Sequence, residues 1–306
     1  MTRAALSTQD YEAFRAFLED ACGIVLGDNK HYLVVSRLTR LMADEGVATL
    51  GELVSHVKDG RNRSLRERIV EAMTTNETFW FRDTFPFDIL KDIILPDLAE
   101  RRVRNPRVWS AACSSGQEPY SISMTVQEYL AGRPGSLSDV QIVATDISPT
   151  ILGEAKQGVY DSLAVARGLS QERKQRFFVQ QRDGYWQARP EIRNRVQFNQ
   201  ANLLQSYSLL GRFDVIFCRN VLIYFSSESK ADILARMARV LNPGGYLFLG
   251  SSESITQYSD EFELVRCPRG SVYRVKNGLA ARPTTIMTQA QTSVRPLARP
   301  LPDGKP

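Results

Sequence analysis

The sequence of 306 residues is poor in the side chains that bind metals or cross-link chains. It has two histidines and four cysteines, and no two cysteines stand at the C-x-x-C spacing. Zinc sites need clustered Cys and His ligands, and disulfide frameworks need regularly spaced cysteines. We therefore expect no metal site, and we expect the cysteines to be small buried residues.

Long apolar runs are also missing. The longest have the length of a strand, far below the ~20 residues of a membrane helix, and the N-terminus has no apolar signal core. We expect a cytoplasmic monomer without membrane insertion. The net charge is +5, but the last 30 residues hold four basic side chains and one acid. The remaining excess is too small to indicate nucleic-acid binding.

What the sequence does contain divides it into parts. Apolar residues at helical spacing, punctuated by glycines, predict a helical domain of four helices over residues 1–75. A polar and then aromatic linker over residues 76–90 follows. We expect an α/β domain over residues 91–276, and a disordered tail over residues 277–306, which is rich in proline and lacks an apolar period.

Strands and helices alternate in the α/β domain, which predicts a parallel sheet with crossover helices. The last two strand-like segments, residues 261–266 and 271–276, read as an antiparallel hairpin. This ending fits a Rossmann-like methyltransferase sheet better than a dehydrogenase sheet. Residues 158–195 exceed what one crossover needs, and two short β runs around Arg182-Asp183-Gly184 indicate a small inserted β-subdomain.

The first strand and turn of this domain point to a nucleotide-like ligand. The turn over residues 112–118 lacks the G-x-G-x-x-G of dinucleotide sites, whereas Asp146 ends the next apolar strand, where a carboxylate can accept ribose hydroxyls. A ligand with ribose but no phosphate fits best, and S-adenosylmethionine is the common one.

Other polar residues follow the predicted strands. Glu118 could face a cationic ligand, Asn202 and Leu203 could frame an adenine, and Asn220 opens toward the same crevice. Each also has an ordinary interpretation, as a helix-terminal acid or a turn residue. Tyr224 follows the fourth strand without the two prolines of DNA adenine methylases, and Arg82 could bind a carboxylate or pair with an aromatic ring.

Five segments together resemble the CheR-type chemoreceptor methyltransferases. They are TNETFWFRD, WSAACSSGQEPYSIS, ATDIS, FCRNVLIYF and LNPGGYLFLGSSES. The resemblance covers residues 11–276. It implies a helical N-terminal domain, a methyltransferase α/β domain with an inserted β-subdomain, and transfer of a methyl group from S-adenosylmethionine to glutamate side chains of chemoreceptors.

The resemblance also implies roles for single residues. Arg82 and Tyr224 would be catalytic. The cofactor would be bound by Asn76, Thr78, Arg82, Glu118, Asp146, Asn202, Leu203, Arg219 and Asn220. The helical domain would present basic residues to the acidic receptor helix, and the candidates are Lys30, Arg37, Arg40, Arg61, Arg63, Arg66 and Arg68.

One departure from the family pattern concerns docking. Members that bind a pentapeptide at the receptor C-terminus have a longer, glycine-rich loop in the β-subdomain, whereas the hairpin here turns tightly at residues 182–184. We therefore expect no dependence on the pentapeptide.

Three other functions stay open from the sequence. The protein could methylate another acceptor, such as a small acid or RNA, or it could be a cofactor-binding regulatory module without catalysis. A nicotinamide dehydrogenase is disfavoured, because the glycine fingerprint is missing and no histidine follows residue 56 to donate a proton.

Overall fold

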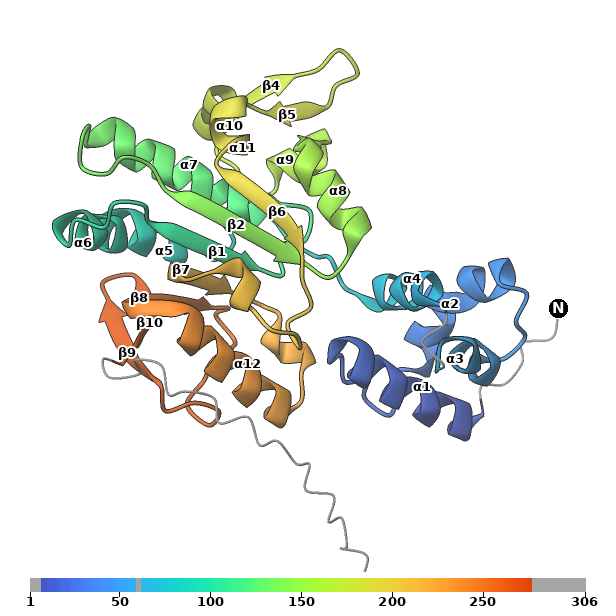
Figure 1. The fold of residues 1–306 in the computed structure, drawn as a ribbon. Helices are drawn as coiled ribbons and strands as arrows, with labels where there is room; N and C mark the ends of the chain where they lie inside the picture. Colours follow the sequence, from blue (N-terminus) through green and yellow to red (C-terminus); the bar gives the residue numbers. More distant parts are fainter. Residues whose placement is uncertain (1–6, 59–61, 277–306) are drawn as a thin grey trace, which may run out of the picture.

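The structure is a computed structural model that describes residues 7–58 and 62–276 (Figure 1). The predicted tail over residues 277–306 and the candidate Arg61 lie outside the described residues. No helix within the described ranges is long and apolar enough to cross a membrane.

The N-terminal domain is a bundle of four helices, as predicted. They are α1 (Thr8–Cys22), α2 (His31–Asp44), α3 (Leu50–Lys58) and α4 (Arg63–Met73). Side chains at the helix starts satisfy exposed backbone donors: the Ser7 hydroxyl accepts from Asp10 N and Asn62 accepts from Leu65 N. The apolar stripes meet in a core of their own.

The spacing of apolar residues predicts one amphipathic helix around residues 87–100. The structure has three consecutive helical segments, α5 (Phe85–Ile89), a π-helical turn (Leu90–Ile94) and α6 (Leu95–Glu100). Pro96 has no N–H and its ring crowds the preceding turn, so a regular helix cannot run through it. The wider turn accommodates the proline, with Leu95 N donating to Leu90 O.

The second domain is built on a mixed seven-stranded sheet in the order β6-β2-β1-β7-β8-β10-β9. Its strands are β1 (Arg107–Ala111), β2 (Gln141–Asp146), β6 (Val196–Gln200), β7 (Phe213–Cys218), β8 (Leu241–Leu249), β9 (Phe262–Cys267) and β10 (Gly270–Val275). The first five are parallel, and β10 pairs antiparallel with both β8 and β9. This confirms the predicted fold class.

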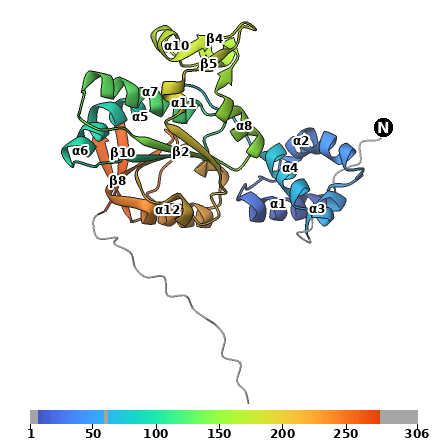
Figure 2. The ribbon, with the colours of Figure 1, turned by 45° about the horizontal axis from the view of Figure 1, so that its top comes forward.

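Helices cover both faces of the sheet. On one face lie α7 (Gln117–Gly132) and α8 (Pro149–Gln157) together with α5 and α6, and on the other lies α12 (Ser227–Val240). Figure 2 shows α12 and α7 on opposite sides of the strands. The strand order changes direction at β1, which lies between β2 and β7, so a crevice opens beyond the carboxyl ends of these strands. The helical domain lies at this edge (Figure 1).

The expected β-hairpin is present within the insert between β2 and β6. A small antiparallel sheet contains β3 (Val159–Tyr160), β5 (Trp186–Ala188) and β4 (Phe178–Gln180). The sequence analysis did not anticipate the three short helices around it, α9 (Ser162–Ala166), α10 (Gln171–Phe177) and α11 (Pro190–Arg193).

Candidate active site

A pocket lies in the crevice beyond the strand ends and extends to the linker and the helical domain. It encloses about 1060 Å³ of empty space, part of it open to solvent. All ten residues that the sequence analysis selected as catalytic or cofactor-binding line it, namely Asn76, Thr78, Arg82, Glu118, Asp146, Asn202, Leu203, Arg219, Asn220 and Tyr224. Residues up to 148 positions apart in the chain are therefore brought to one cavity.

Backbone strain is concentrated around this pocket. Within the described ranges, seven residues other than glycine have positive φ, and six of them lie in the linker turn, in the turn after β1 or directly after β7. The six are Phe81, Asp83, Thr84, Ala112, Ser114 and Asn220. Strained backbone persists only where surrounding contacts hold it, and it is typical of functional sites.

Asp146 lies at the end of β2, as predicted, and is held by backbone donors. One carboxylate oxygen accepts from Ser114 N at 2.8 Å and the other from Ser148 N at 3.1 Å. An ionised carboxylate has about four lone-pair positions, so each oxygen keeps an acceptor position for a hydroxyl group. Burial raises the pKa of Asp146, although the backbone hydrogen bonds act in the opposite direction.

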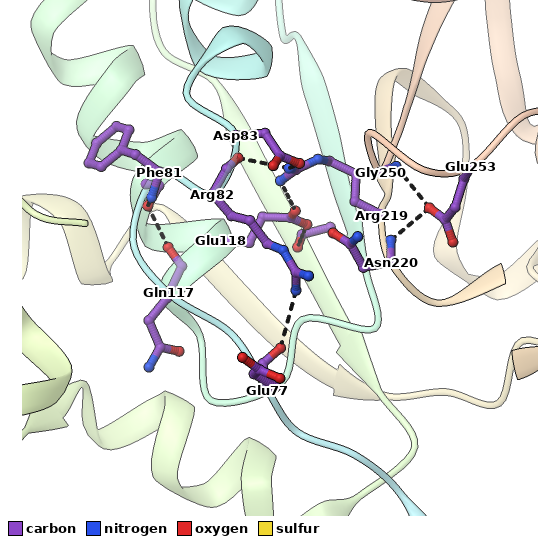
Figure 3. A network of polar contacts seen from close by, with 12 residues as sticks. Glu77, Phe81, Arg82, Asp83, Gln117, Glu118, Arg219, Asn220, Gly250 and Glu253 are labelled. Atoms are coloured by element: carbon purple, nitrogen blue, oxygen red, sulfur yellow. Dashed lines mark hydrogen bonds and ion pairs between the residues drawn. The ribbon is translucent and has the colours of Figure 1, made fainter. Parts of the chain in front are cut away.

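Glu118 forms a buried charged network with Arg219 (Figure 3). Arg219 Nη1 lies 3.0 Å from Glu118, and its Nη2 lies 2.7 Å from Asp83 and donates to the backbone oxygen of Arg82. The other Glu118 oxygen accepts from Ser110 Oγ at 2.7 Å. Burial raises the pKa of Glu118 while Arg219 and Ser110 lower it, with a net increase.

This network changes the interpretation of Arg219. Its side chain is only 1% exposed and is occupied by two carboxylates and a carbonyl. Nη1 and Nη2 of Arg219 are thus engaged within the protein and fasten the linker turn to the end of β7, whereas its Nε is buried and has no hydrogen-bond partner among the described residues. Asp83 is the last residue of the TNETFWFRD segment, and its charge beside Arg82 was the signal that the sequence analysis passed over.

Arg82 and Tyr224 both line the pocket. The Arg82 guanidinium lies over the Phe79 ring, 5.4 Å from its centroid, and donates to Glu77 O at 3.5 Å. Within residues 7–58 and 62–276 it forms no ion pair with a carboxylate. Tyr224 ends a 3-10 turn after β7 (Leu222–Tyr224), and its backbone oxygen accepts from Val25 N at 2.8 Å.

Asn202 differs from the expectation that its amide would bind an adenine. Its Nδ2 donates to Ala21 O in the helical domain at 2.9 Å, and its Oδ1 accepts from Leu204 N at 2.9 Å. The amide thus joins the two domains, and Leu203 beside it is 7% exposed and supplies apolar surface. Sequence alone could not place α1 against this turn.

The predicted basic face of the helical domain is divided in the structure. Arg37 is half-buried and donates to the backbone oxygens of Met73 and Thr74 at 2.6 and 2.9 Å, so part of its guanidinium is engaged within the protein. Arg63, Arg66 and Arg68 pair with neighbouring acids. Lys30 and Arg40 are exposed, and within the described part of the chain they form no ion pair.

The pocket suits S-adenosylmethionine by its donors and acceptors. Asp146 offers acceptor positions to hydroxyl groups, Glu118 offers negative charge to a cation, and the turn after β1 has no glycine-rich phosphate cradle. Together with the reversed strand β10 of the sheet, these features define an S-adenosylmethionine-dependent methyltransferase.

Comparison with known proteins specifies the family. Residues 9–74 match the CheR methyltransferase all-alpha domain, and residues 76–271 match the CheR methyltransferase SAM binding domain. The chain therefore belongs to the CheR methyltransferase family.

Relatives with similar sequences carry the same designation. Chemotaxis protein methyltransferase Cher2 of Pseudomonas putida is 54% identical over 272 residues, which cover 87% of this chain and 98% of that protein. Chemotaxis protein methyltransferase 1 of Pseudomonas aeruginosa is 55% identical over 87% of this chain and 98% of its own length. The chemotaxis protein methyltransferase of Salmonella typhimurium is 37% identical over 86% and 89%.

Proposed function

We propose that this protein transfers the methyl group of S-adenosylmethionine to glutamate side chains on the cytoplasmic helical domain of a chemoreceptor, forming methyl esters. The designation of its relatives as chemotaxis protein methyltransferases supports the acceptor. The observation that carries the proposal is the Arg82 guanidinium, which lines the pocket and has no carboxylate partner among the described residues. A free cation in the pocket that Tyr224 also lines suits an incoming carboxylate.

The chemistry requires positioning more than proton transfer. A glutamate has a reference pKa of ~4.3, so it is an ionised nucleophile at neutral pH and needs no general base. S-adenosylmethionine supplies an electrophilic methyl group on a sulfonium. Arg82 and the Tyr224 hydroxyl would orient one carboxylate oxygen toward it, since holding reactants at ~3–3.5 Å supplies a large part of a rate acceleration.

Charge decides how strongly Arg82 should bind the acceptor. The carboxylate loses its negative charge as the ester forms, so a tight ion pair would stabilise the ground state more than the transition state. Arg82 is already stacked on Phe79 and half-buried, a pose that limits its movement. We therefore assign it a role in orientation.

The receptor would approach through the helical domain in this proposal. Lys30 and Arg40 on or beside α2 are exposed and without acidic partners among the described residues, so they are the strongest candidates for contact with an acidic receptor helix. Arg63, Arg66 and Arg68 would have to leave acidic neighbours first. A cytoplasmic monomer is sufficient for this arrangement.

The experiment is methyl transfer from radiolabelled S-adenosylmethionine to a purified chemoreceptor cytoplasmic fragment. We expect labelled receptor whose label is released by mild alkali as methanol, since esters hydrolyse and N- or C-methyl groups do not. A receptor fragment with its acceptor glutamates changed to alanine should stay unlabelled. Alkali-stable label, or none with any receptor, would contradict the proposal.

We further propose that docking does not use a receptor C-terminal pentapeptide. In the small sheet, β4 and β5 are joined by a short turn in which Gln181 N donates to Tyr185 O at 2.7 Å. With this short turn, the β4–β5 hairpin has no extended loop that could bind a peptide. Calorimetric titration with receptor-tail peptides should give no binding, and methylation should be equal for receptors with and without the tail. Tight peptide binding would contradict this.

A further inference from the structure

Glu253, in the loop after β8, has a carboxylate engaged entirely with backbone donors. One oxygen accepts from Asn220 N at 2.7 Å and from Gly250 N at 2.8 Å (Figure 3). The other accepts from Ile223 N at 3.2 Å. Hydrogen bonds to an ionised acceptor are stronger than neutral ones. Glu253 thus joins the exit of β8 to the turn that leaves β7.

That turn needs such support because Asn220 has a strained backbone. Its φ is +58°, in the left-handed region that side chains other than glycine rarely adopt. Asparagine tolerates this region better than most residues, but surrounding contacts must select it. The hydrogen bond from Asn220 N to Glu253 is such a contact. The hydrogen bond from Ile223 N to Glu253 fixes the following 3-10 turn, which ends at Tyr224.

The Asn220 carboxamide lies against Gly250. A Cβ at position 250 would come within 2.6 Å of Asn220 Nδ2 and within 2.8 Å of a Glu253 oxygen. The missing side chain therefore makes room for the amide. Asn220 Oδ1 is buried, lies in the wall of the pocket, and has no hydrogen-bond partner among the described residues. A buried acceptor without a partner is costly unless a ligand supplies the donor.

We infer that Glu253 is a positioning residue: its carboxylate fixes the turn after β7 and, with Gly250, directs the Asn220 carboxamide oxygen toward a donor on the bound cofactor. S-adenosylmethionine has ammonium, hydroxyl and amino donors that can serve. Because Ile223 N also donates to the Glu253 carboxylate, Glu253 helps to set the position of Tyr224. This second consequence rests on the proposed function.

A double-mutant cycle on the full chain tests the inference without a receptor. The probe is S-adenosylhomocysteine, with affinities measured by calorimetry for wild type, Glu253→Gln, Asn220→Ala and the double variant. Glutamine keeps the size of Glu253 but sets an NH₂ group against backbone donors. We expect Glu253→Gln to weaken binding about tenfold in the wild-type background and to have no further effect in Asn220→Ala, which lacks the directed amide.

Two further variants separate positioning from general stability. Glu263→Gln, an exposed acid on β9, is the matched control and should bind like wild type. Gly250→Ala should weaken binding as Glu253→Gln does, because the added Cβ would collide with both the Asn220 amide and a Glu253 oxygen; it also replaces Glu253→Gln if that variant fails to fold. Thermal denaturation checks folding throughout. Unchanged affinity, or equal loss in both Asn220 backgrounds, would overturn the inference.

Turnover gives the second readout. We expect Glu253→Gln at saturating S-adenosylmethionine to methylate a receptor at least tenfold more slowly than wild type, because Tyr224 is displaced with its turn. Wild-type protein that transfers no methyl group would refute the proposed function alone, since the binding cycle needs no acceptor. Wild-type turnover in a well-folded Glu253→Gln would refute the positioning of Tyr224.

Discussion

At the scale of single residues, Arg82 is distinguished by its guanidinium, which has no carboxylate partner among the described residues. It shares the Phe79 ring with Arg167, whose guanidinium lies 4.7 Å from the same centroid and pairs with Glu77. The two arginines have similar surroundings, but only Arg82 lines the pocket. Arg167 is thus a natural control for a role of Arg82 in catalysis.

We expect Arg82→Ala to lower turnover on the order of 10²-fold while receptor affinity changes less than threefold, because orientation is lost and binding elsewhere is kept. Arg167→Ala should keep turnover within about threefold. Single-turnover methylation and receptor titration measure the two quantities. If Arg82→Ala lost receptor affinity alone, the catalytic assignment would be wrong.

Glu118 gives a prediction for pH. Its pKa is raised by burial, so it takes up a proton at a higher pH than an ordinary glutamate. The affinity for cationic S-adenosylmethionine should therefore fall as the pH falls from 7 toward 5. Folding raises this pKa, so protonation of Glu118 adds to the stability of the free protein as the pH falls.

Calorimetry of S-adenosylmethionine binding across this range, with wild type and Glu118→Gln, measures the effect. The glutamine variant should bind more weakly at pH 7 and show a flatter dependence. An identical pH dependence in both proteins would assign the titration to another group.

At the scale of elements, the linker is held by α9 and by the residues that follow it. Trp80 N donates to Arg167 O and Trp80 Nε1 donates to Ala164 O at 3.0 Å. Gly168 approaches from the same side, where a Cβ would lie 2.1 Å from Trp80 O, and its φ is +96°. The insert is therefore also a support for the segment that carries Arg82.

We expect Gly168→Ala to lower the free energy of unfolding by about 3 kcal/mol, from the strained φ and the collision with the linker backbone together. Gly184 has φ +84° and open space around it, so a substitution there measures the cost of the strained φ alone. Gly184→Ala should cost about 1 kcal/mol. Denaturant unfolding of both variants measures the difference, and equal losses would show that the close approach to Trp80 is unimportant.

At the scale of the whole molecule, the helical domain completes the cofactor site. Glu71 on α4 accepts from Ser148 Oγ and from Thr150 N at the start of α8, and Ser148 N in turn donates to Asp146. The bond between Val25 N and Tyr224 O joins the domains at the opposite wall. The orientation of the helical domain and the shape of the pocket are thus linked by direct hydrogen bonds.

We expect Glu71→Ala to weaken S-adenosylhomocysteine binding about fivefold and to lower stability by about 1–3 kcal/mol, the loss typical of hydrogen bonds to a charged group. Glu67→Gln, one turn earlier on the same helix and paired only with exposed Arg63, is the control and should change neither. Unchanged affinity in Glu71→Ala would show that Ser148 holds Asp146 without help from the helical domain.

The sequence by itself determined the elements and the inventory of the site. Apolar periodicity is local, so it predicted the four helices, the alternating strands and the final hairpin. Polar residues that directly follow strands converge in a parallel sheet, which is why Asp146, Glu118 and Asn220 were found together. Pro96 can be seen in the sequence as a helix breaker, but the choice of a π-helical turn before it depends on how the segment packs.

Only the tertiary structure decided which of these side chains are free. Arg37, Arg219 and Asn202 each donate hydrogen bonds to groups distant in the chain, which no local pattern could predict. Glu253 was part of a recognised segment without a role until Asn220 lay beside it. Charge and residue type are properties of the sequence, whereas a partner 30 to 180 positions away exists only once the chain has folded.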